Sequence, residues 1–481
     1  MEDSVTRLLQ QTGAADITAD SRAAGPGVVF AAYPGTARDG RDFIPQAISR
    51  GAAGVLWEAR DYVWDPAWRV ANAAVDRLKE KVGAIAAQVY GEPSRALRLI
   101  GVTGTNGKTS VAHWIAQALS RLGERAALMG TVGNGFPGQL APAGNTTPDA
   151  VELQKALASY VREGAHACAL EVSSHGLDQG RVNGCRFHTA VFTNLSRDHL
   201  DYHGDMASYA AAKARLFSWP ELQYAVLNLD DPQGAEMARM LKGPRMIGYS
   251  LAAAGALRGR LLKSDLGGLA LAIASDWGSA ELHASVLGAF NASNLLGALG
   301  ALLAAGADLP AACRALATVQ PPPGRMQLFG APGQPTVVVD YAHTPDALEK
   351  VLKTLKQAAG GGRVICVFGC GGNRDRGKRP LMGRAAEEFA DEIIVTSDNP
   401  RHEDPLAILS DIVAGMARRP RTEPDRARAI FEAVGEAGSG DVVLIAGKGH
   451  ETYQEIEDRR LPFDDTEVAR RALAAWGGRR V

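Results

Sequence analysis

Residues 101–109 read Gly-Val-Thr-Gly-Thr-Asn-Gly-Lys-Thr and stand between an apolar run, Leu97 to Val102, and a helix-like stretch, Val111 to Leu122. This order of strand, glycine-rich loop and helix is typical of a phosphate-binding loop. The glycines let backbone N–H groups turn toward phosphate oxygens, Lys108 supplies a cation, and the Thr109 hydroxyl suits magnesium. We therefore expect ATP and Mg²⁺ here, with the nucleotide bound by Gly104, Thr105, Asn106, Gly107, Lys108, Thr109 and Ser110.

The loop departs from the strict GxxxxGK[ST] pattern, because Val102 stands at the first glycine position and Gly101 one residue earlier. The alternative is a glycine-rich strand-to-helix turn that binds no ligand. The pairing of Lys108 with Thr109 at this spacing favours the phosphate loop.

Other apolar runs also stop abruptly at a polar or glycine-rich cluster, and helix-like stretches separate them. This pattern indicates buried strands in parallel α/β sheets, whose ligands bind beyond the carboxyl ends of the strands. The runs are Ala167 to Leu170, Val191 to Phe192, Val337 to Val339, Val364 to Phe368, Ile393 to Val395 and Val442 to Ala446.

A chain of 481 residues exceeds what one hydrophobic core usually supports, so several domains are expected. The run Gln-Pro-Pro-Pro-Gly at 320–324 excludes a helix or a central strand and predicts a stiff linker. We expect three α/β domains: a smaller N-terminal domain at 1–94, a central domain with a P-loop ATPase-like parallel sheet at 95–322, and a C-terminal Rossmann-like domain at 323–481.

The composition argues against several classes of protein. Fifty-two basic and fifty-three acidic residues give a net charge of -1, which disfavours a general nucleic-acid or membrane-surface binder. Five scattered cysteines suit a reducing cytosol, and the first residues do not resemble a signal peptide. The most apolar stretch, Leu295 to Gly306, is short for a membrane span and predicts a buried helix. We expect a cytoplasmic monomer with no nucleic-acid partner and no membrane insertion.

Acidic residues and histidines follow two of the predicted strands. Magnesium prefers oxygen ligands and tolerates an occasional imidazole, so Thr109, Glu171 and His199 form a plausible metal set. For His175 and His203 a structural role is as plausible as ligand contact. By its pattern alone, Lys213 reads as a surface lysine on an amphipathic helix.

Residues 104–109 resemble the nucleotide loop of the Mur ligase and folylpolyglutamate synthetase superfamily, whose members make amides from carboxylates. Nearly the whole chain is similar to the UDP-N-acetylmuramoyl-L-alanyl-D-glutamate ligases, which add the third residue of the cell-wall peptide. The resemblance implies ATP-driven ligation through an acyl phosphate, with Lys108 and His199 in the catalytic site. It also implies that Lys213 is carbamylated and binds a second magnesium ion, and that Arg325 and Asp340 approach the nucleotide.

The same resemblance assigns the acceptor substrate. Ser21 and residues 35–43 match the uridine-diphosphate region. A further group of hydroxyls, amides and one guanidinium suits an anionic, hydroxylated ligand and matches the positions that hold the muramoyl dipeptide. These residues are Asn145, Thr146, Thr147, Ser173, Gln179 and Arg181.

Two more runs at strand ends, Asp-Asn-Pro-Arg at 398–401 and Gly-Lys-Gly-His-Glu at 447–451, suit an amino acid that carries both charges. The resemblance implies that Arg401 binds the second carboxylate of meso-diaminopimelate, a carboxylate that lysine lacks. The alternative is an Asn-Pro turn with a solvated arginine. The predicted amino-acid site comprises Arg374, Asp398, Asn399, Pro400, Arg401, Gly447 and Glu451.

Two other functions stay open. Folylpolyglutamate synthetase shares the loop, but the residues before the loop and the run at 398–401 count against it. A nucleotide-dependent switch would hydrolyse ATP without either acceptor. A dinucleotide fingerprint at 369–374 is rejected, because Arg374 takes the third glycine position.

Overall fold

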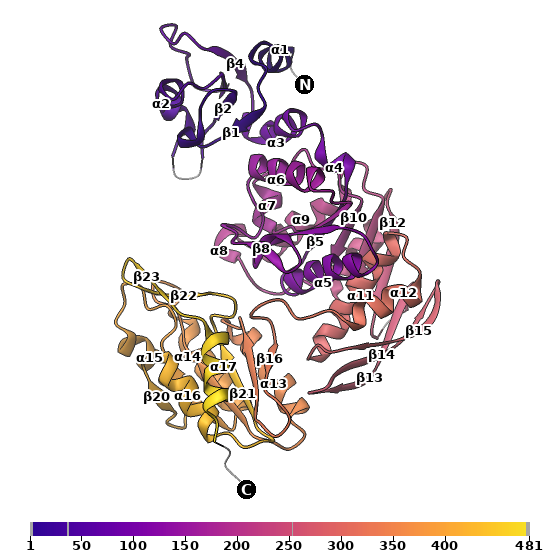
Figure 1. The fold of residues 1–481 in the computed structure, drawn as a ribbon, viewed down its shortest axis with the longest axis vertical. Coiled ribbons are helices and arrows are strands. Elements are labelled where there is room, and N and C mark those ends of the chain that lie inside the picture. Colours follow the sequence, from indigo (N-terminus) through magenta and orange to yellow (C-terminus); the bar gives the residue numbers. More distant parts are fainter. Residues whose placement is uncertain (1–2, 36–37, 253, 478–481) are drawn as a thin grey trace. The chain divides into compact units, whose positions relative to one another are not determined.

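The computed structural model describes residues 3–35, 38–252 and 254–477. The chain divides into two compact units (Figure 1). The first unit comprises Met1–Arg258, Ala274–Gly278 and Ser293–Ala315. The second unit comprises Gly259–Ile273, Ser279–Ala292 and Leu316–Val481.

The first unit begins with a small α/β layer. Its four strands run parallel in the order β1-β2-β3-β4, with bounds Asp16–Thr18, Val28–Ala32, Gly54–Glu58 and Ala71–Val75. The helices of this layer are α1 (Asp3–Thr12), α2 (Ile44–Ser49), α3 (Leu78–Val89) and α4 (Pro93–Ala96). Its core includes Ala150 and Val151, the first two residues of helix α6 (Ala150–Arg162). The layer therefore packs on the start of α6.

The phosphate-loop strand lies inside a large sheet with the order β15-β14-β13-β12-β11-β10-β5-β9-β6-β7-β8. From β12 to β6 the pairing is parallel, and β7 and β8 are antiparallel. The bounds are β5 Arg98–Thr103, β6 Ala126–Gly130, β7 Gly133–Phe136, β8 Gln139–Ala141, β9 Ala167–Glu171, β10 Thr189–Phe192, β11 Tyr224–Asn228, β12 Arg245–Ser250, β13 Leu257–Asp265, β14 Gly268–Ser275 and β15 Gly278–Ala284.

Successive residues of the central strands are buried, as continuous apolar runs require, and helices pack on the sheet. The helices are α5 Lys108–Arg121, α6 Ala150–Arg162, α7 Ser174–Asp178, α8 Leu200–His203, α9 Met206–Ala214, α10 Pro232–Met240, α11 Ala289–Ala304 and α12 Leu309–Ala317. The predicted strands at β5, β9 and β10 and the apolar helix at α11 are confirmed. Among the described residues, no helix is both long and apolar enough to cross a membrane.

The second unit is built on a sheet with the order β16-β17-β21-β18-β19-β20, parallel except for the edge strand β16. Its strands are β16 Gln327–Phe329, β17 Thr336–Asp340, β18 Val364–Phe368, β19 Glu392–Thr396, β20 Arg421–Glu423 and β21 Val442–Ala446. The four predicted strands of this block are therefore confirmed. Residues 320–324 form neither helix nor strand, as expected.

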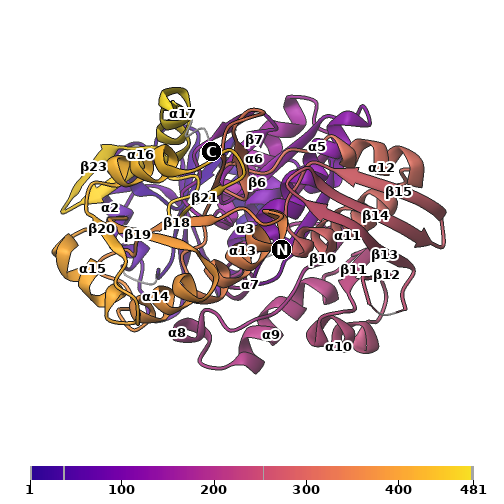
Figure 2. The same ribbon diagram turned by 90° about the horizontal axis from the view of Figure 1, so that it is seen from below.

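Helices cover both faces of this second sheet (Figure 2). On one face lie α13 (Pro345–Ala358), α14 (Lys378–Phe389) and α15 (Pro405–Val413), and on the other lie α16 (Arg426–Glu436) and α17 (Asp465–Ala475). A separate hairpin, β22 (Tyr453–Ile456) with β23 (Arg459–Pro462), follows the last parallel strand. The α/β class with parallel-rich sheets is confirmed.

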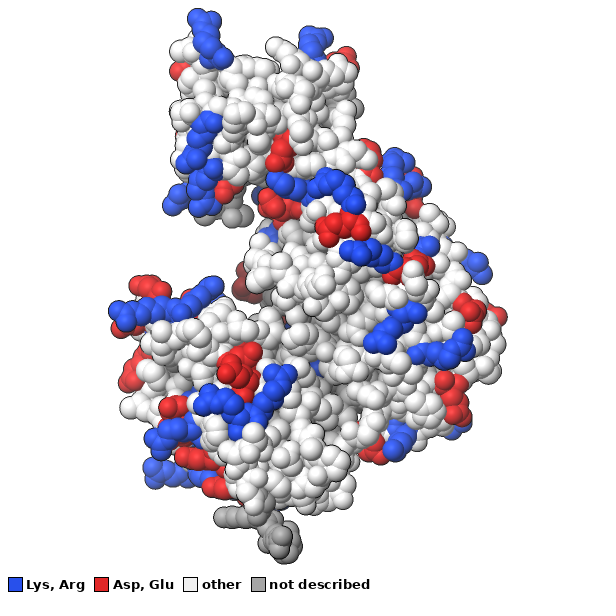
Figure 3. All heavy atoms as spheres, in the orientation of Figure 1, with Lys and Arg blue, Asp and Glu red and all other residues white. Residues whose placement is uncertain are grey.

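All five cysteines are buried and free. Basic and acidic side chains alternate over the molecular face drawn in Figure 3, without a single-sign field on that face.

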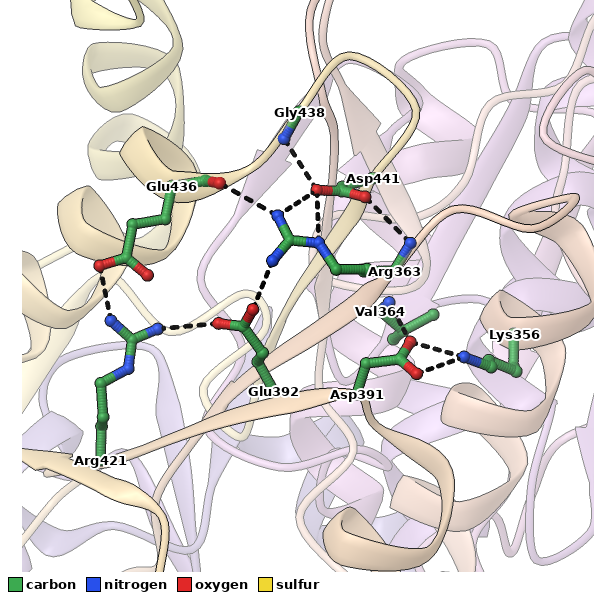
Figure 4. Close-up of polar contacts among 9 residues, drawn as sticks. All are labelled: Lys356, Arg363, Val364, Asp391, Glu392, Arg421, Glu436, Gly438 and Asp441. Atoms are coloured by element: carbon green, nitrogen blue, oxygen red, sulfur yellow. Dashed lines mark hydrogen bonds and ion pairs between the residues drawn. The ribbon is translucent and has the colours of Figure 1, made fainter. Parts of the chain in front are cut away.

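The amino ends of the second sheet carry a network of ion pairs (Figure 4). Arg363 donates to Asp441 from Nη2 at 2.6 Å and also pairs with Glu392. Asp441 is 8% exposed and accepts further bonds from the backbone N–H groups of Arg363 and Gly438. Burial raises the pKa of Asp441, but the Arg363 and backbone hydrogen bonds outweigh it and leave the pKa below its usual value.

We expect Arg363→Ala to lower the free energy of unfolding of the second unit by about 1–3 kcal/mol at neutral pH, because Asp441 loses its charged partner. Since the folded pKa of Asp441 lies below the ordinary 3.8, its contribution is present above that pH and is lost as the pH falls through the folded value. Urea unfolding at neutral and acidic pH measures both effects. Lys350→Ala, which breaks an exposed helical pair with Asp346, is the control. If the native and Arg363→Ala proteins differed in free energy of unfolding as much in acid as at neutral pH, the predicted pH dependence would be wrong.

Candidate active site

The phosphate-loop glycines occupy backbone positions that other residues would strain. Gly104 has φ +149° and Gly107 has φ +86°. A Cβ on Gly104 would lie 1.9 Å from Thr193 Oγ1, and one on Gly107 would lie 2.4 Å from Asn294 Oδ1. The loop therefore needs glycine both for its turn and for close approach of β10 and α11. Its backbone leads straight into α5, whose first turn carries Lys108, Thr109 and Ser110.

Two lysines converge on this loop. Lys108 Nζ donates to Gly104 O at 2.8 Å and to Thr105 O at 2.9 Å. Lys213 Nζ, from α9, donates to the same Gly104 oxygen at 2.8 Å. The residue pattern suggested a surface lysine, and that interpretation is wrong, because Lys213 is 1% exposed. Helix periodicity identified one face of α9 but could not show that α9 also contacts α7 and α8.

Burial changes the chemistry of Lys213. Desolvation, chiefly, and the nearby charge of Lys108 hold the pKa of Lys213 well below that of an ordinary lysine. Its Nζ also lies 4.4 Å from the centre of the Tyr209 ring. Burial and Lys108 therefore both disfavour the charged form of this amine.

Glu171 joins the loop to the next strand. This residue, 1% exposed, accepts a hydrogen bond from Thr109 Oγ1 at 2.9 Å and another from the backbone N–H of Thr131 at 2.8 Å. The Thr131 hydroxyl also donates to Glu171 at 3.2 Å and lies 2.9 Å from the Thr146 hydroxyl. A hydroxyl beside a buried carboxylate at the end of a phosphate loop is a donor set that fits magnesium.

His199 lies beside these groups. Its ring centre is 6.0 Å from that of Tyr209 and 4.8 Å from that of His175, and its backbone has φ +53°. Burial, chiefly, lowers the pKa of His199, and the charges of Lys108 and Lys213 lower it further. Within the described ranges, no group of three or more His, Cys, Asp or Glu side chains is arranged to hold a metal. The predicted set instead mixes hydroxyl, carboxylate, imidazole and amine.

The residues predicted to hold the acceptor peptide lie together beyond β9. Thr147 Oγ1 donates to Glu171 O at 2.9 Å and to Ser173 Oγ at 3.1 Å. Arg181 donates to Thr147 O at 2.9 Å and, from two nitrogens, to Gln179 Oε1 at 3.0 and 2.7 Å. Asn145 and Thr146 precede them in the chain. Ser21 lies instead in the small N-terminal layer, where its hydroxyl donates to Gln46 at 2.7 Å, and residues 36 and 37 of the predicted uridine region lie outside the described residues.

In the second unit, Asp340 ends β17 and is buried. It accepts from the backbone N–H groups of Met326 at 2.7 Å and Ala342 at 2.8 Å. Desolvation raises the pKa of Asp340 above its ordinary value. The Arg325 guanidinium lies 4.8 Å from the centre of the Tyr341 ring, and its buried Nε has no hydrogen-bond partner among the described residues. The nearby charge of Arg325 partly offsets this effect of burial on Asp340.

The carboxyl ends of β19 and β21 bring the two predicted amino-acid runs together. Asn399 Nδ2 donates to Glu451 Oε2 at 2.8 Å. Gly447 has φ +117°, and a Cβ there would lie 2.6 Å from Asp398 Oδ2. The two loops therefore meet closely, and glycine is required at the contact.

Arg401 is not the solvated arginine of the alternative interpretation. Its side chain is 19% exposed, with Nε bonded to Glu455 Oε2 at 2.8 Å and Nη1 bonded to Gly372 O at 2.9 Å. The residue adopts φ +50° and pairs with β22 through its backbone. Arg374, by contrast, is exposed, and its Nη1 donates to the adjacent Asn373 O at 3.3 Å.

Sequence reasoning missed several residues of these clusters. Tyr209 and Thr131 carried no motif signal, although both contact the phosphate-loop region. Glu455 also had no signal, because its strand β22 was not predicted. Lys448 lay inside a quoted run, and the glycines on either side of it could have marked it as a buried strand-end residue.

Three family models match the chain. They are described as "Mur ligase family, catalytic domain" at residues 15–92, "Mur ligase middle domain" at 102–302 and "Mur ligase, glutamate ligase domain" at 324–449. Two relatives carry the name UDP-N-acetylmuramoyl-L-alanyl-D-glutamate--2,6-diaminopimelate ligase. The one from Chromobacterium violaceum is 53% identical and covers 98% of this chain and 97% of its own length. The one from Pseudomonas aeruginosa is 51% identical and covers 96% and 95%.

Solved structures agree. One ligase with that same name matches with a TM-score of 0.73 at 42% identity, covering 96% of this chain and 95% of its own. A Mycobacterium tuberculosis folylpolyglutamate synthase complexed with ADP matches with a TM-score of 0.62 at 22% identity, covering 78% of this chain and 92% of its own. The latter likeness shows the fold alone.

Proposed function

Since this chain belongs to the Mur ligase family, we propose that it adds meso-2,6-diaminopimelate to UDP-N-acetylmuramoyl-L-alanyl-D-glutamate, with ATP as the energy source. The observation that carries the proposal is the near full-length match, at 53% identity, to a relative named for that reaction. The reaction belongs to cytoplasmic peptidoglycan precursor synthesis, on which bacterial cell wall, shape and division depend. The enzyme acts as a monomer.

The reaction is an ATP-driven amide bond formation. The D-glutamyl side-chain carboxylate attacks the γ-phosphate, ADP leaves, and an acyl phosphate forms. The amine of diaminopimelate then attacks the acyl carbon, losing a proton, and inorganic phosphate leaves. The loop N–H groups and Lys108 hold the phosphates and offset their charge during the first step. We also propose that Arg325 and Asp340 bind the nucleotide.

The metal site uses groups around the same loop. Thr109, Glu171, His199 and a carbamate on Lys213 would hold Mg²⁺, which supplies positive charge near the phosphates when bound. Lys213 is suited to carbamylation because burial and the nearby charge of Lys108 disfavour its ammonium form. The carbamate would turn a buried like-charge pair into a buried opposite-charge pair.

The acceptor and the amino acid use different strand ends. Thr147, Ser173 and Arg181 bind the dipeptide part of the acceptor, which carries the reacting carboxylate. For the amino acid, the guanidinium of Arg401 would form two hydrogen bonds with the far carboxylate of diaminopimelate, whereas the ammonium of lysine would face a like charge there. The remaining residues of this site are Arg374, Asp398, Asn399, Pro400, Gly447 and Glu451.

Phosphate release from ATP tests the proposal directly. With the nucleotide dipeptide present, we expect release with meso-diaminopimelate, at least about 100-fold slower release with lysine, and none above background without an amino acid. Release without any acceptor would indicate a switch instead. Release with a folate and glutamate would indicate the folylpolyglutamate synthetase activity.

A further inference from the structure

A closed set of hydrogen bonds lies at the carboxyl ends of β19 and β21. Lys448 Nζ donates to Asn399 Oδ1 at 3.0 Å and to Glu451 Oε2 at 2.9 Å. Asn399 Nδ2 donates to the same Glu451 oxygen at 2.8 Å. The Lys448 side chain is 0% exposed, so this ammonium has been withdrawn from water entirely into the cluster. A buried charge of this kind requires a partner, and Glu451 supplies it.

Lys448 and the backbone N–H of Glu455 together orient the Asn399 amide. Asn399 Oδ1 accepts from Lys448 and also from the backbone N–H of Glu455 at 2.9 Å. An ammonium and a backbone N–H can only donate, so the oxygen of the amide must face them. The Asn399 NH₂ group is thereby turned toward Glu451, where it meets a carboxylate.

Lys448 also determines how Glu451 is presented. The bonds from Lys448 and from Asn399 both go to Oε2. Among the described residues, Oε1 of Glu451 has no hydrogen-bond partner, and the Glu451 side chain is 20% exposed against 0% for Lys448. Oε2 of Glu451 is therefore occupied by Lys448 and Asn399, while Oε1 remains open to a donor such as an ammonium group.

We propose that Lys448 is a positioning residue for the amino-acid substrate, which acts by orienting the Asn399 amide and the Glu451 carboxylate. The inference rests on the proposed function, in which those two side chains bind the amino acid. Lys448 itself does not touch the substrate, because its ammonium is enclosed by the groups it orients. Without it, the Glu451 carboxylate loses its cationic partner and the Asn399 amide keeps only one of the two donors to its oxygen, so both groups are held less firmly when the substrate binds.

The test is the variant Lys448→Met, which keeps the length of the side chain and removes the donor. We expect its KM for diaminopimelate to rise about 10- to 100-fold, because two oriented hydrogen-bonding groups are lost. Its KM for ATP and for the nucleotide dipeptide should stay within about twofold of native, since neither contacts this cluster in the proposed mechanism. Lys356→Met, which removes a lysine paired with Asp391 at the amino ends of the strands, is the matched control and should leave all three values unchanged.

A double-mutant cycle shows whether Lys448 acts through Glu451. If it does, Lys448→Met should raise the KM for diaminopimelate much less in a Glu451→Gln background than in the native one. Lys448→Gln, which keeps a neutral donor, should give an intermediate KM. A partly unfolded preparation does not obscure these results, because KM is independent of the amount of active enzyme.

An unchanged KM for diaminopimelate in Lys448→Met, or an equal rise in all three KM values, would overturn the positioning role and leave the proposed function intact. A native enzyme that ligates nothing with the nucleotide dipeptide and diaminopimelate would instead overturn the proposed function, and the inference with it.

Discussion

Lys213→Ala is expected to reduce ligation by about 1,000-fold or more, with partial recovery when bicarbonate is added. Lys213 Nζ and Lys108 Nζ both lie 2.8 Å from Gly104 O, inside the phosphate loop. Two ammonium groups at this site would repel, and this repulsion adds to the larger effect of burial in lowering the pKa of Lys213. A carbamate on Lys213 would go further and supply anionic oxygen ligands for Mg²⁺.

Bicarbonate can restore activity because the Lys213→Ala substitution makes room for it. Lys213→Ala leaves a cavity in a buried position, and bicarbonate supplies a small anion of similar shape to the missing carbamate. Lys213→Arg is the matched control, because it keeps a cation, fills the space and cannot be carbamylated. It should be inactive and should not respond to bicarbonate. Steady-state phosphate release, with and without bicarbonate, measures all three proteins. A Lys213→Ala enzyme with native activity would remove the carbamate from the mechanism.

Arg401→Ala is expected to lower kcat/KM for diaminopimelate by about 100- to 1,000-fold without slowing the turnover of lysine, whose ammonium no longer faces a like charge. Glu455 and Gly372 O already hold the Arg401 guanidinium, so the fork is ordered before substrate arrives. Removing it leaves the far carboxylate of diaminopimelate without its charged partner. Lysine has no such carboxylate and so has little to lose.

Arg401→Lys separates charge from geometry. A lysine keeps the positive charge but replaces two parallel hydrogen bonds with a point charge, so we expect intermediate discrimination. Comparing kcat/KM for diaminopimelate and lysine across the three proteins gives the result as a ratio. If Arg401→Ala slowed both amino acids equally, Arg401 would serve the structure of the loop rather than the choice of substrate.

Prediction from sequence worked where one local rule was sufficient. The runs at β5, β9, β17, β18 and β21 are buried on both faces of parallel sheets, so their apolar character is continuous and visible in the sequence. Prediction failed for the environment of Lys213. An alanine-rich helix with one lysine is compatible with exposure or burial, and the burial comes from neighbours distant in sequence.

The sequence by itself determined the α/β class, the strand ends and the phosphate loop, because glycine positions and apolar runs act through the local backbone and its burial. Only the tertiary structure decided that Lys213 reaches Gly104, that β22 brings Glu455 to Arg401, and that Lys448 lies beneath Asn399 and Glu451. Those contacts join residues up to 109 positions apart, and no periodicity along the chain encodes such pairings. Whether a charge is buried depends on what folds over it, so its chemistry becomes defined only when the chain has packed.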